Sequence, residues 1–152
     1  MSESAEQASF EIPVDWIRWR RAGQVQLDQS GYLAFPRVDA VPGIYRFTIE
    51  DGTTNVAQYV GQAARSLRTR FSLTTSRNAR YLLDALASAR TVWVDLVDDQ
   101  ATGPDGQVLV INFADKTLRS RLEKGLILQA CQTDSKVLNR GGNPGWDDAR
   151  SV

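Results

Sequence analysis

The sequence contains no histidine and only one cysteine, Cys131. Without histidine, the chain cannot build a His-ligated zinc site, a Ser-His-Asp triad or a Cys-His dyad. A single cysteine excludes an internal disulfide, and the CxxC spacing of many metal sites is absent. Any proton transfer by this protein must therefore use tyrosine, a carboxylate, lysine or water.

Long apolar runs are missing as well. No run approaches the roughly 18 residues needed to cross a bilayer. The first nine residues hold two glutamates and no basic residue, which does not fit a secretory signal. We expect a soluble, cytoplasmic protein with no membrane partner. Its 152 residues, 42% hydrophobic and 24% charged, suit one globular domain with a real core.

An excess of one charge sign is also absent, because the formal net charge is zero. The charges are nevertheless unevenly distributed. Residues 61–83 contain no acid and five arginines, whereas Asp95, Asp98, Asp99 and Asp105 gather further along. Local charge sets the field at a binding face. We predict that four of these arginines contact nucleic acid, the alternative being a solvated helix face: Arg65, Arg68, Arg77 and Arg80.

The hydrophobic pattern predicts an α+β fold with a small, mainly antiparallel central sheet flanked by helices. Strands are expected at 43–49, 56–61, 91–97 and 108–113. Helices are expected from about 66, from Asn78 as N-cap, and from Asp115 or Thr117 to about 131. We divide the chain into a disordered N-terminus (1–9), an N-terminal arm that is either a short helix or extended (10–42), a main domain (43–140) and a flexible tail (141–152).

The first two strands are predicted to form a hairpin around the turn at Asp51-Gly52. A hairpin centred on Gly52 pairs Tyr45 with Tyr59 and Gly43 with Gly61. Opposed residues share a face of the sheet, so both tyrosines would project together. The two glycines would leave the surface bare for a ligand. The alternative is that both tyrosines are ordinary core aromatics.

Gly43-Ile44-Tyr45 followed by Tyr59-Val60-Gly61 resembles the two-part signature of the GIY-YIG endonucleases. That family also has an arginine early in the next helix, a glutamate on a later helix and an asparagine beyond it. The resemblance covers about residues 42–140 and supplies matching residues in this order: Arg70, Glu123 and Asn139.

The resemblance implies a metal-dependent endonuclease that hydrolyses DNA phosphodiester bonds. Tyr45 would act as general base or orient the attacking water, and Tyr59 would hydrogen-bond the phosphate or the nucleophile. Arg70 would stabilise the transition state through its two-pronged guanidinium. Glu123 would hold Mg²⁺ (or Mn²⁺), which often takes one or two carboxylates and keeps several waters. Asn139 would support the site by hydrogen bonding.

Each assignment has a plainer alternative. Arg68 is a rival for Arg70, which could also be a surface salt-bridge residue. Glu123 borders an apolar stripe, where a carboxylate needs compensation, but it could instead pair with Arg119 one turn away. Asn139 could be a turn residue ahead of two glycines.

The chain departs from the family at two positions. Many members have lysine where this chain has Gln62, and histidine or tyrosine where it has Thr74. Both changes remove groups proposed to assist proton transfer, and Tyr81 is a candidate substitute. They support an alternative function, a catalytically inactive nucleic-acid-binding module on the same scaffold. A third alternative is a structural or protein-interaction domain with three tryptophans at a partner surface: Trp16, Trp19 and Trp146.

The expected substrate is double-stranded DNA, although the sequence does not distinguish DNA from RNA. No separate DNA-reading domain is visible. Specificity would then come from the N-terminal arm, from loops or from a second protein, either another copy in a homodimer or a specificity subunit. Restriction, repair and mobile-element roles remain open.

Overall fold

The computed structural model describes residues 12–74 and 79–139. The predicted disordered N-terminus (1–9) and flexible tail (141–152) lie outside these residues, as do Arg77 and the predicted helix cap Asn78. The elements follow in this order: η1 (Val14–Trp16), β1 (Trp19–Leu27), β2 (Leu33–Ala34), β3 (Gly43–Asp51), β4 (Thr54–Ala63), α2 (Leu67–Ser72), α3 (Arg80–Ala87), β5 (Thr91–Val97), β6 (Gln100–Thr102), β7 (Val108–Val110), α4 (Lys116–Ala130) and β8 (Lys136–Val137).

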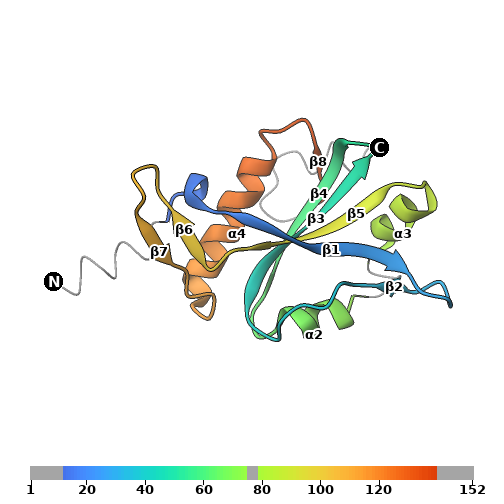
Figure 1. Cartoon of the computed structure of the whole chain (residues 1–152), viewed down its shortest axis with the longest axis horizontal. Coiled ribbons are helices and arrows are strands. Elements are labelled where there is room, and N and C mark those ends of the chain that lie inside the picture. Colours follow the sequence, from blue (N-terminus) through green and yellow to red (C-terminus); the bar gives the residue numbers. More distant parts are fainter. Residues whose placement is uncertain (1–11, 75–78, 140–152) are drawn as a thin grey trace.

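Six strands form one sheet in the order β2-β1-β5-β3-β4-β8, and all neighbours are antiparallel except β4 and β8. The predicted α+β fold with a mainly antiparallel sheet is confirmed. Residues 10–42, expected as an arm, contribute β1 and β2 to this sheet. The expected strand at 108–113 is shorter and pairs with β6 in a separate hairpin, which lies beyond one end of the sheet (Figure 1).

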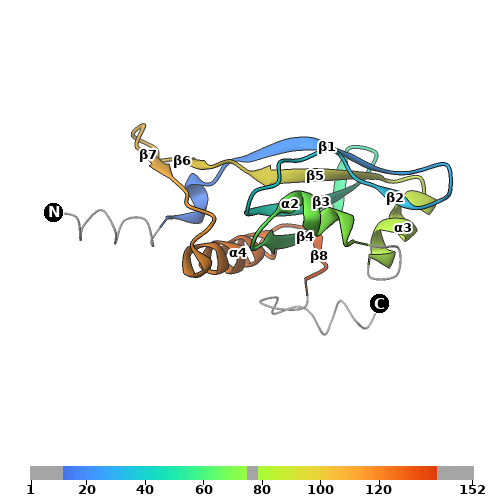
Figure 2. The same cartoon turned by 90° about the horizontal axis from the view of Figure 1, so that it is seen from below.

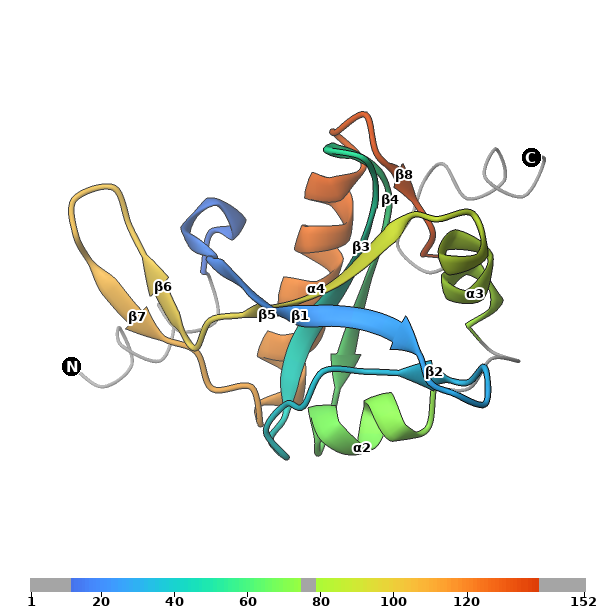
Figure 3. The same cartoon turned by 45° about the vertical axis from the view of Figure 1, so that its right-hand side comes forward.

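Alternation along β3 separates two faces of the sheet. Tyr45, Phe47 and Ile49 join the core that contains residues of α2 and α3. Ile44 joins a second core that contains Leu118, Leu122 and Leu126 of α4, among others. We call these the aromatic face and the α4 face. Figure 3 shows α4 alongside β3 and β4, away from α2 and α3, and Figure 2 shows it near β4 and far from β1.

The hairpin register differs from the predicted one by two residues. Tyr45 pairs with Gly61, and Tyr59 pairs with Phe47. The turn accounts for one residue of this difference, because Asp51 pairs with Thr54. An irregularity between Ile49 and Glu50 accounts for the second. Since side chains alternate with a period of two, a two-residue shift keeps the two tyrosines on the same face, as predicted. The predicted facing of Tyr45 with Tyr59 and of Gly43 with Gly61 is wrong.

Helix α4 forms as its sequence predicts. The carboxylate of Asp115 accepts a hydrogen bond from the backbone N–H of Leu118 and caps the first turn. Leu118, Leu122 and Leu126 are 2–3% exposed. Burying each leucine contributes about 1.5–3 kcal/mol, which outweighs the weak helix propensity of any single position. No helix in the described part of the chain is long and apolar enough to cross a membrane.

Candidate functional site

The Tyr45 ring is buried against the backbone of Gly61. Tyr45 is 2% exposed, and its ring centroid lies 5.2 Å from that of Phe47 and 5.1 Å from that of Phe71. A Cβ added to Gly61 would lie 2.4 Å from both Cζ and Oη of Tyr45. Gly61 therefore provides the space that this ring occupies. The expectation of a bare surface at the glycines is wrong, because Tyr45 covers Gly61 and Leu67 covers Gly43.

Arg70 meets the hydroxyl of Tyr45. Its Nε–H donates to Tyr45 Oη at 3.3 Å, and this hydrogen bond is the main cause that raises the pKa of Arg70. A hydrogen bond to Tyr59 raises the pKa of Arg70 further. Arg70 is otherwise exposed, so its guanidinium is open to a ligand. Since the Tyr45 oxygen accepts from Arg70, its own O–H proton is free to donate elsewhere.

Burial raises the pKa of Tyr45, and the hydrogen bond from Arg70 only partly opposes this. A general base would need the opposite shift, because an unperturbed tyrosine titrates near pH ~10. The geometry thus favours the second role considered for Tyr45, a neutral phenol that orients water or phosphate. Tyr81 lies beside Tyr59, with ring centroids 5.8 Å apart, and burial raises its pKa as well.

Glu123 lies on the α4 face, in a chain of hydrogen bonds. Its Oε1 accepts from Gln62 Nε2 at 3.2 Å, and Gln62 Oε1 accepts from Arg119 Nε at 2.6 Å. Arg119 is only 5% exposed and also donates to the carbonyl of Phe113 at 2.7 Å. Gln62 thus links the two charged residues, which the sequence suggested might pair directly across one helical turn.

The two halves of the candidate site approach each other around the edge of β4. Tyr45 and Arg70 belong to the aromatic face, and Gln62 and Glu123 to the α4 face. Burial raises the pKa of Glu123, whereas the Gln62 hydrogen bond and the charges of Arg119 and Arg70 lower it. The Glu123 charge likewise acts on Tyr45. The carboxylate and the phenol–guanidinium pair therefore share one electrostatic environment, although a strand separates their faces.

The edge of β4 is open where the two halves meet. Strand β8 pairs with β4 only at Ala57 and Gln58. One step further, the Asn139 side chain continues the ladder: its Oδ1 accepts from Val60 N at 2.8 Å and its Nδ2 donates to Val60 O. Asn139 is 5% exposed and fixes the residue between Tyr59 and Gly61. On the edge of β4 away from β3, no strand in the described chain pairs with β4 at Gly61 or beyond.

The other candidate arginines occupy different settings. Arg68 donates from Nε to the carbonyl of Val38 at 2.9 Å, so its guanidinium is anchored away from Tyr45. Arg80 lies 3.9 Å from Asp84 in an exposed pair, and Arg65 is exposed. Arg77 falls outside the described residues. Thr74, where the family often has a proton-transfer group, donates to the carbonyl of Arg70 at 3.0 Å.

Sequence reasoning missed two residues of the α4 face. Arg119 was considered only as a surface partner of Glu123, yet it is buried. Asp95 was grouped with the neighbouring acids, yet it is 2% exposed and accepts hydrogen bonds from Arg21, Arg46 and Thr48. A signal for Asp95 was available, because in the run Thr91–Val97 it stands between two apolar residues in a strand buried on both sides.

Within the described residues, no group of three or more cysteine, aspartate or glutamate side chains is placed to hold a metal ion. A dedicated protein cage for a metal is therefore not formed by this part of the chain. Glu123 alone offers a partly buried carboxylate whose charge is disfavoured by burial. Such a donor fits a Mg²⁺ ion that keeps most of its waters and is completed by substrate phosphate.

No protein-family model and no curated protein matched this chain. Among solved structures, a mutant of bacteriophage T4 EndoII is similar to this chain. The similarity has a TM-score of 0.47 and 18% sequence identity, and it covers 88% of this chain and 96% of that one.

Proposed function

We propose that the protein is a metal-dependent endonuclease of the GIY-YIG type that hydrolyses DNA phosphodiester bonds. The observation that carries this proposal is the Arg70–Tyr45 hydrogen bond over Gly61, at an open strand edge and under the electrostatic influence of Glu123. The guanidinium and the phenol are hydrogen-bonded to each other, and the carboxylate, from a third segment of the chain, interacts with both through its charge. These groups suit stabilisation of a phosphate in an otherwise rigid scaffold.

In this proposal, the guanidinium of Arg70 binds the scissile phosphate and stabilises the charge that grows on its oxygens. Tyr45 stays protonated, because burial raises its pKa, and donates its O–H to the attacking water or to a phosphate oxygen. Tyr59 completes the phenol pair beside Arg70. The oxygen of the attacking water forms the new bond to phosphorus and loses a proton to solvent water. The bond to the 3′ oxygen breaks, and this oxygen takes up a proton from solvent.

Glu123 would hold Mg²⁺ (or Mn²⁺), oriented by the amide of Gln62 and by buried Arg119. When bound, this ion would neutralise negative charge on the leaving 3′ oxygen. Asn139 would act as a positioning residue, since it fixes the backbone between Tyr59 and Gly61. Arg65, Arg68 and Arg80 would contact the DNA backbone beside this centre, with Arg77 as a further candidate. One centre cuts one strand, so a homodimer or a partner subunit would supply the second cut or the sequence specificity.

The test is plasmid cleavage with Mg²⁺ by the wild type and three variants: Glu123→Gln, Arg70→Lys and Tyr45→Phe. Losing a preorganised charge or donor costs about 10²–10³-fold in rate. We expect losses of that order from Glu123→Gln and Arg70→Lys, and a smaller loss from Tyr45→Phe. Arg90→Lys is the matched control, because Arg90 lies in an exposed pair with Asp51 at the other end of β3 and has no assigned role. Equal cutting by the wild type and all variants contradicts the assignment.

A second candidate is a catalytically inactive nucleic-acid-binding module. It is favoured by the raised pKa of Tyr45 and by Gln62 and Thr74 at positions where the family has proton-transfer groups. Salt-dependent DNA binding without cleavage in Mg²⁺ or Mn²⁺ would support this candidate against the first.

A further inference from the structure

A cleft of about 400 Å³ lies on the α4 face, between the sheet and the end of α4. Its walls come from β1, β3, β4, α4 and the loop after α4, and Glu123 does not line it. The polar lining includes Arg46, Asn55, Gln58 and Asp134, and Trp19 supplies an aromatic wall. The cleft is therefore separate from the candidate catalytic residues, and none of its polar groups has been assigned a role above.

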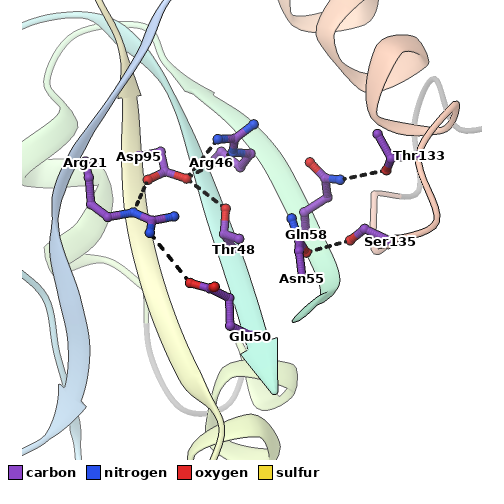
Figure 4. A network of polar contacts seen from close by, with 9 residues as sticks. All are labelled: Arg21, Arg46, Thr48, Glu50, Asn55, Gln58, Asp95, Thr133 and Ser135. Carbon is purple, nitrogen blue, oxygen red and sulfur yellow. Dashed lines mark hydrogen bonds and ion pairs between the residues drawn. The ribbon is translucent and has the colours of Figure 1, made fainter. Parts of the chain in front are cut away.

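Gln58 is the buried polar group of this cleft. It is 4% exposed, and its Nε2 donates to Thr133 Oγ1 at 3.3 Å. Among the described residues, no group donates a hydrogen bond to its carbonyl Oε1. Figure 4 shows this oxygen turned from Thr133 toward the side of Arg46. A buried acceptor without a partner is costly, so it calls for a donor other than the residues that the structure describes.

Arg46 offers a fixed donor in the same cleft. Its Nε and Nη2 each lie 3.0 Å from Asp95 Oδ2, and its Cζ lies 4.2 Å above the centre of the Trp19 ring. Asp95 is held in turn by Arg21 and Thr48, as Figure 4 shows. Within the described chain, Nη1 of Arg46 has no hydrogen-bond partner. The network therefore presents one N–H edge in a preset orientation, with its charge balanced by Asp95.

These groups define the chemistry of a ligand. Gln58 Oε1 and the carboxylate of Asp134 accept hydrogen bonds, and Arg46 Nη1 donates one. A matching ligand carries amino hydrogens next to an acceptor, has no net charge and fits about 400 Å³. Nucleobases with an exocyclic amino group have this pattern: cytosine N4 donates to carboxylates, and guanine O6 accepts from arginine. Thymine lacks the amino group.

We propose that this cleft binds an amino-bearing nucleobase in an unpaired state. The base comes either from a free nucleoside or nucleotide or from an extrahelical position in DNA. Only the second source rests on the proposed nuclease function. Reading a base by its edge in a pocket is chemically independent of cleavage, because Gln58 and Arg46 contact none of the candidate catalytic side chains in the hydrogen bonds described above.

The first experiment titrates the full chain with cytidine, adenosine, guanosine and thymidine, and follows the side-chain signals of Gln58 and Arg46 by ¹⁵N NMR. We expect saturable shifts with one or more amino-bearing nucleosides and at least tenfold weaker binding of thymidine. Gln58→Met keeps the length of the side chain and should weaken binding at least tenfold. Gln132→Met is the matched control, because Gln132 is exposed and does not line the cleft.

A second experiment separates the two sources of the base. Without metal, so that nothing is cut, the affinity for a duplex with one unpaired cytosine is compared with that for an unpaired thymine and for a fully paired duplex. If the protein binds the duplex with the unpaired cytosine most tightly and Gln58→Met abolishes this preference, the base comes from DNA. If nucleosides bind but the duplexes show no such preference, the base comes from a free ligand. If no nucleoside at about 10 mM shifts the NMR signal of the Gln58 side chain, the binding free energy is weaker than ~3 kcal/mol and the proposal is overturned. Thymidine binding as tight as that of every amino-bearing nucleoside overturns it too, whether or not the protein cuts DNA.

Discussion

Replacing Gly61 with alanine tests the packing on which the candidate site depends. The added Cβ would lie 2.4 Å from Tyr45 Cζ and Oη and 2.9 Å from Cε1, far inside van der Waals contact. Gly61 does not have a positive φ, so alanine brings no backbone strain of its own. The whole effect must therefore come from the clash with the ring.

The ring has little room to yield. Tyr45 is 2% exposed and packs against Phe47 and Phe71, so the clash must be relieved by moving the ring or the strand. Overpacking of this kind costs about 1–3 kcal/mol. For a chain of this length that corresponds to a fall in Tm of about 2–12 °C. Moving the ring also breaks the 3.3 Å bond to Arg70, so DNA cleavage should fall about 100-fold or more.

Two measurements distinguish the effects: thermal unfolding, and Mg²⁺-dependent cleavage of a plasmid. The matched control is Gly43→Ala, whose Cβ would lie 2.7 Å from Leu67 Cδ1, the far end of a flexible side chain, and does not meet Tyr45. It should lose some stability and keep the Tyr45–Arg70 pair. In a Tyr45→Leu background, Gly61→Ala should cost much less than in the wild type. An unchanged Tm for Gly61→Ala would refute the reasoning, whatever the activity.

Three further predictions follow from individual contacts. Burial raises the pKa of Glu123, so its charged form destabilises the fold at pH values above its ordinary pKa of 4.5. In pH-dependent calorimetry, Glu123→Gln should therefore raise Tm at neutral pH and show no Tm gain below pH 4.5, while cleavage falls about 10²–10³-fold. Asn139→Ala leaves the N–H and C=O of Val60 without their partner, so urea unfolding should show a loss of about 1–3 kcal/mol per orphaned group. Asp95→Asn removes the buried negative charge that pairs with both Arg21 and Arg46, and urea unfolding should show a loss of about 3–5 kcal/mol. A loss below about 1 kcal/mol would contradict this prediction.

Sequence patterns predicted the elements whose signals are local. The cap at Asp115 and the leucines at i, i+4 and i+8 predicted α4 nearly to the residue, since both signals lie within the helix itself. Strand β5 was predicted with its observed bounds from its β-branched run. In each case, the signal lies within the element itself, although the partners of β5, strands β1 and β3, lie far away in the sequence.

The sequence did not predict features that depend on distant partners. Strand β1 lacks clean alternation because its register shifts between Arg21 and Gly23, and it was expected as a helix or an extended arm. The hairpin register was wrong because one irregularity near the turn moves every later pair. Burial of Arg119 was not visible either, since it requires Gln62 from a strand 57 positions away in the sequence.

The candidate residues Tyr45, Tyr59, Arg70 and Glu123 were chosen from a resemblance, and the structure places the first three together on one face. Glu123 lies on the other face of the sheet, across β4. The sequence could not indicate this, because alternation shows which face a strand residue points to but not which face a helix packs against. Glu123 is nevertheless within electrostatic reach of the others, since the charge of Arg70 lowers its pKa and its own charge raises that of Tyr45.

Gln62 stands where many GIY-YIG endonucleases, which this sequence resembles, have lysine, yet a cation still lies near the carboxylate. A lysine there would place its charge beside Glu123 directly. Here the charge resides on Arg119, and the Gln62 amide joins it to Glu123 through bonds of 2.6 and 3.2 Å. A buried guanidinium bound to two carbonyl oxygens has less freedom than a lysine on a strand edge, since its planar fork is already oriented. The positive charge beside the carboxylate is therefore on α4 instead of β4, and the Gln62 amide orients the carboxylate, so Gln62 alone is a weak argument for an inactive protein.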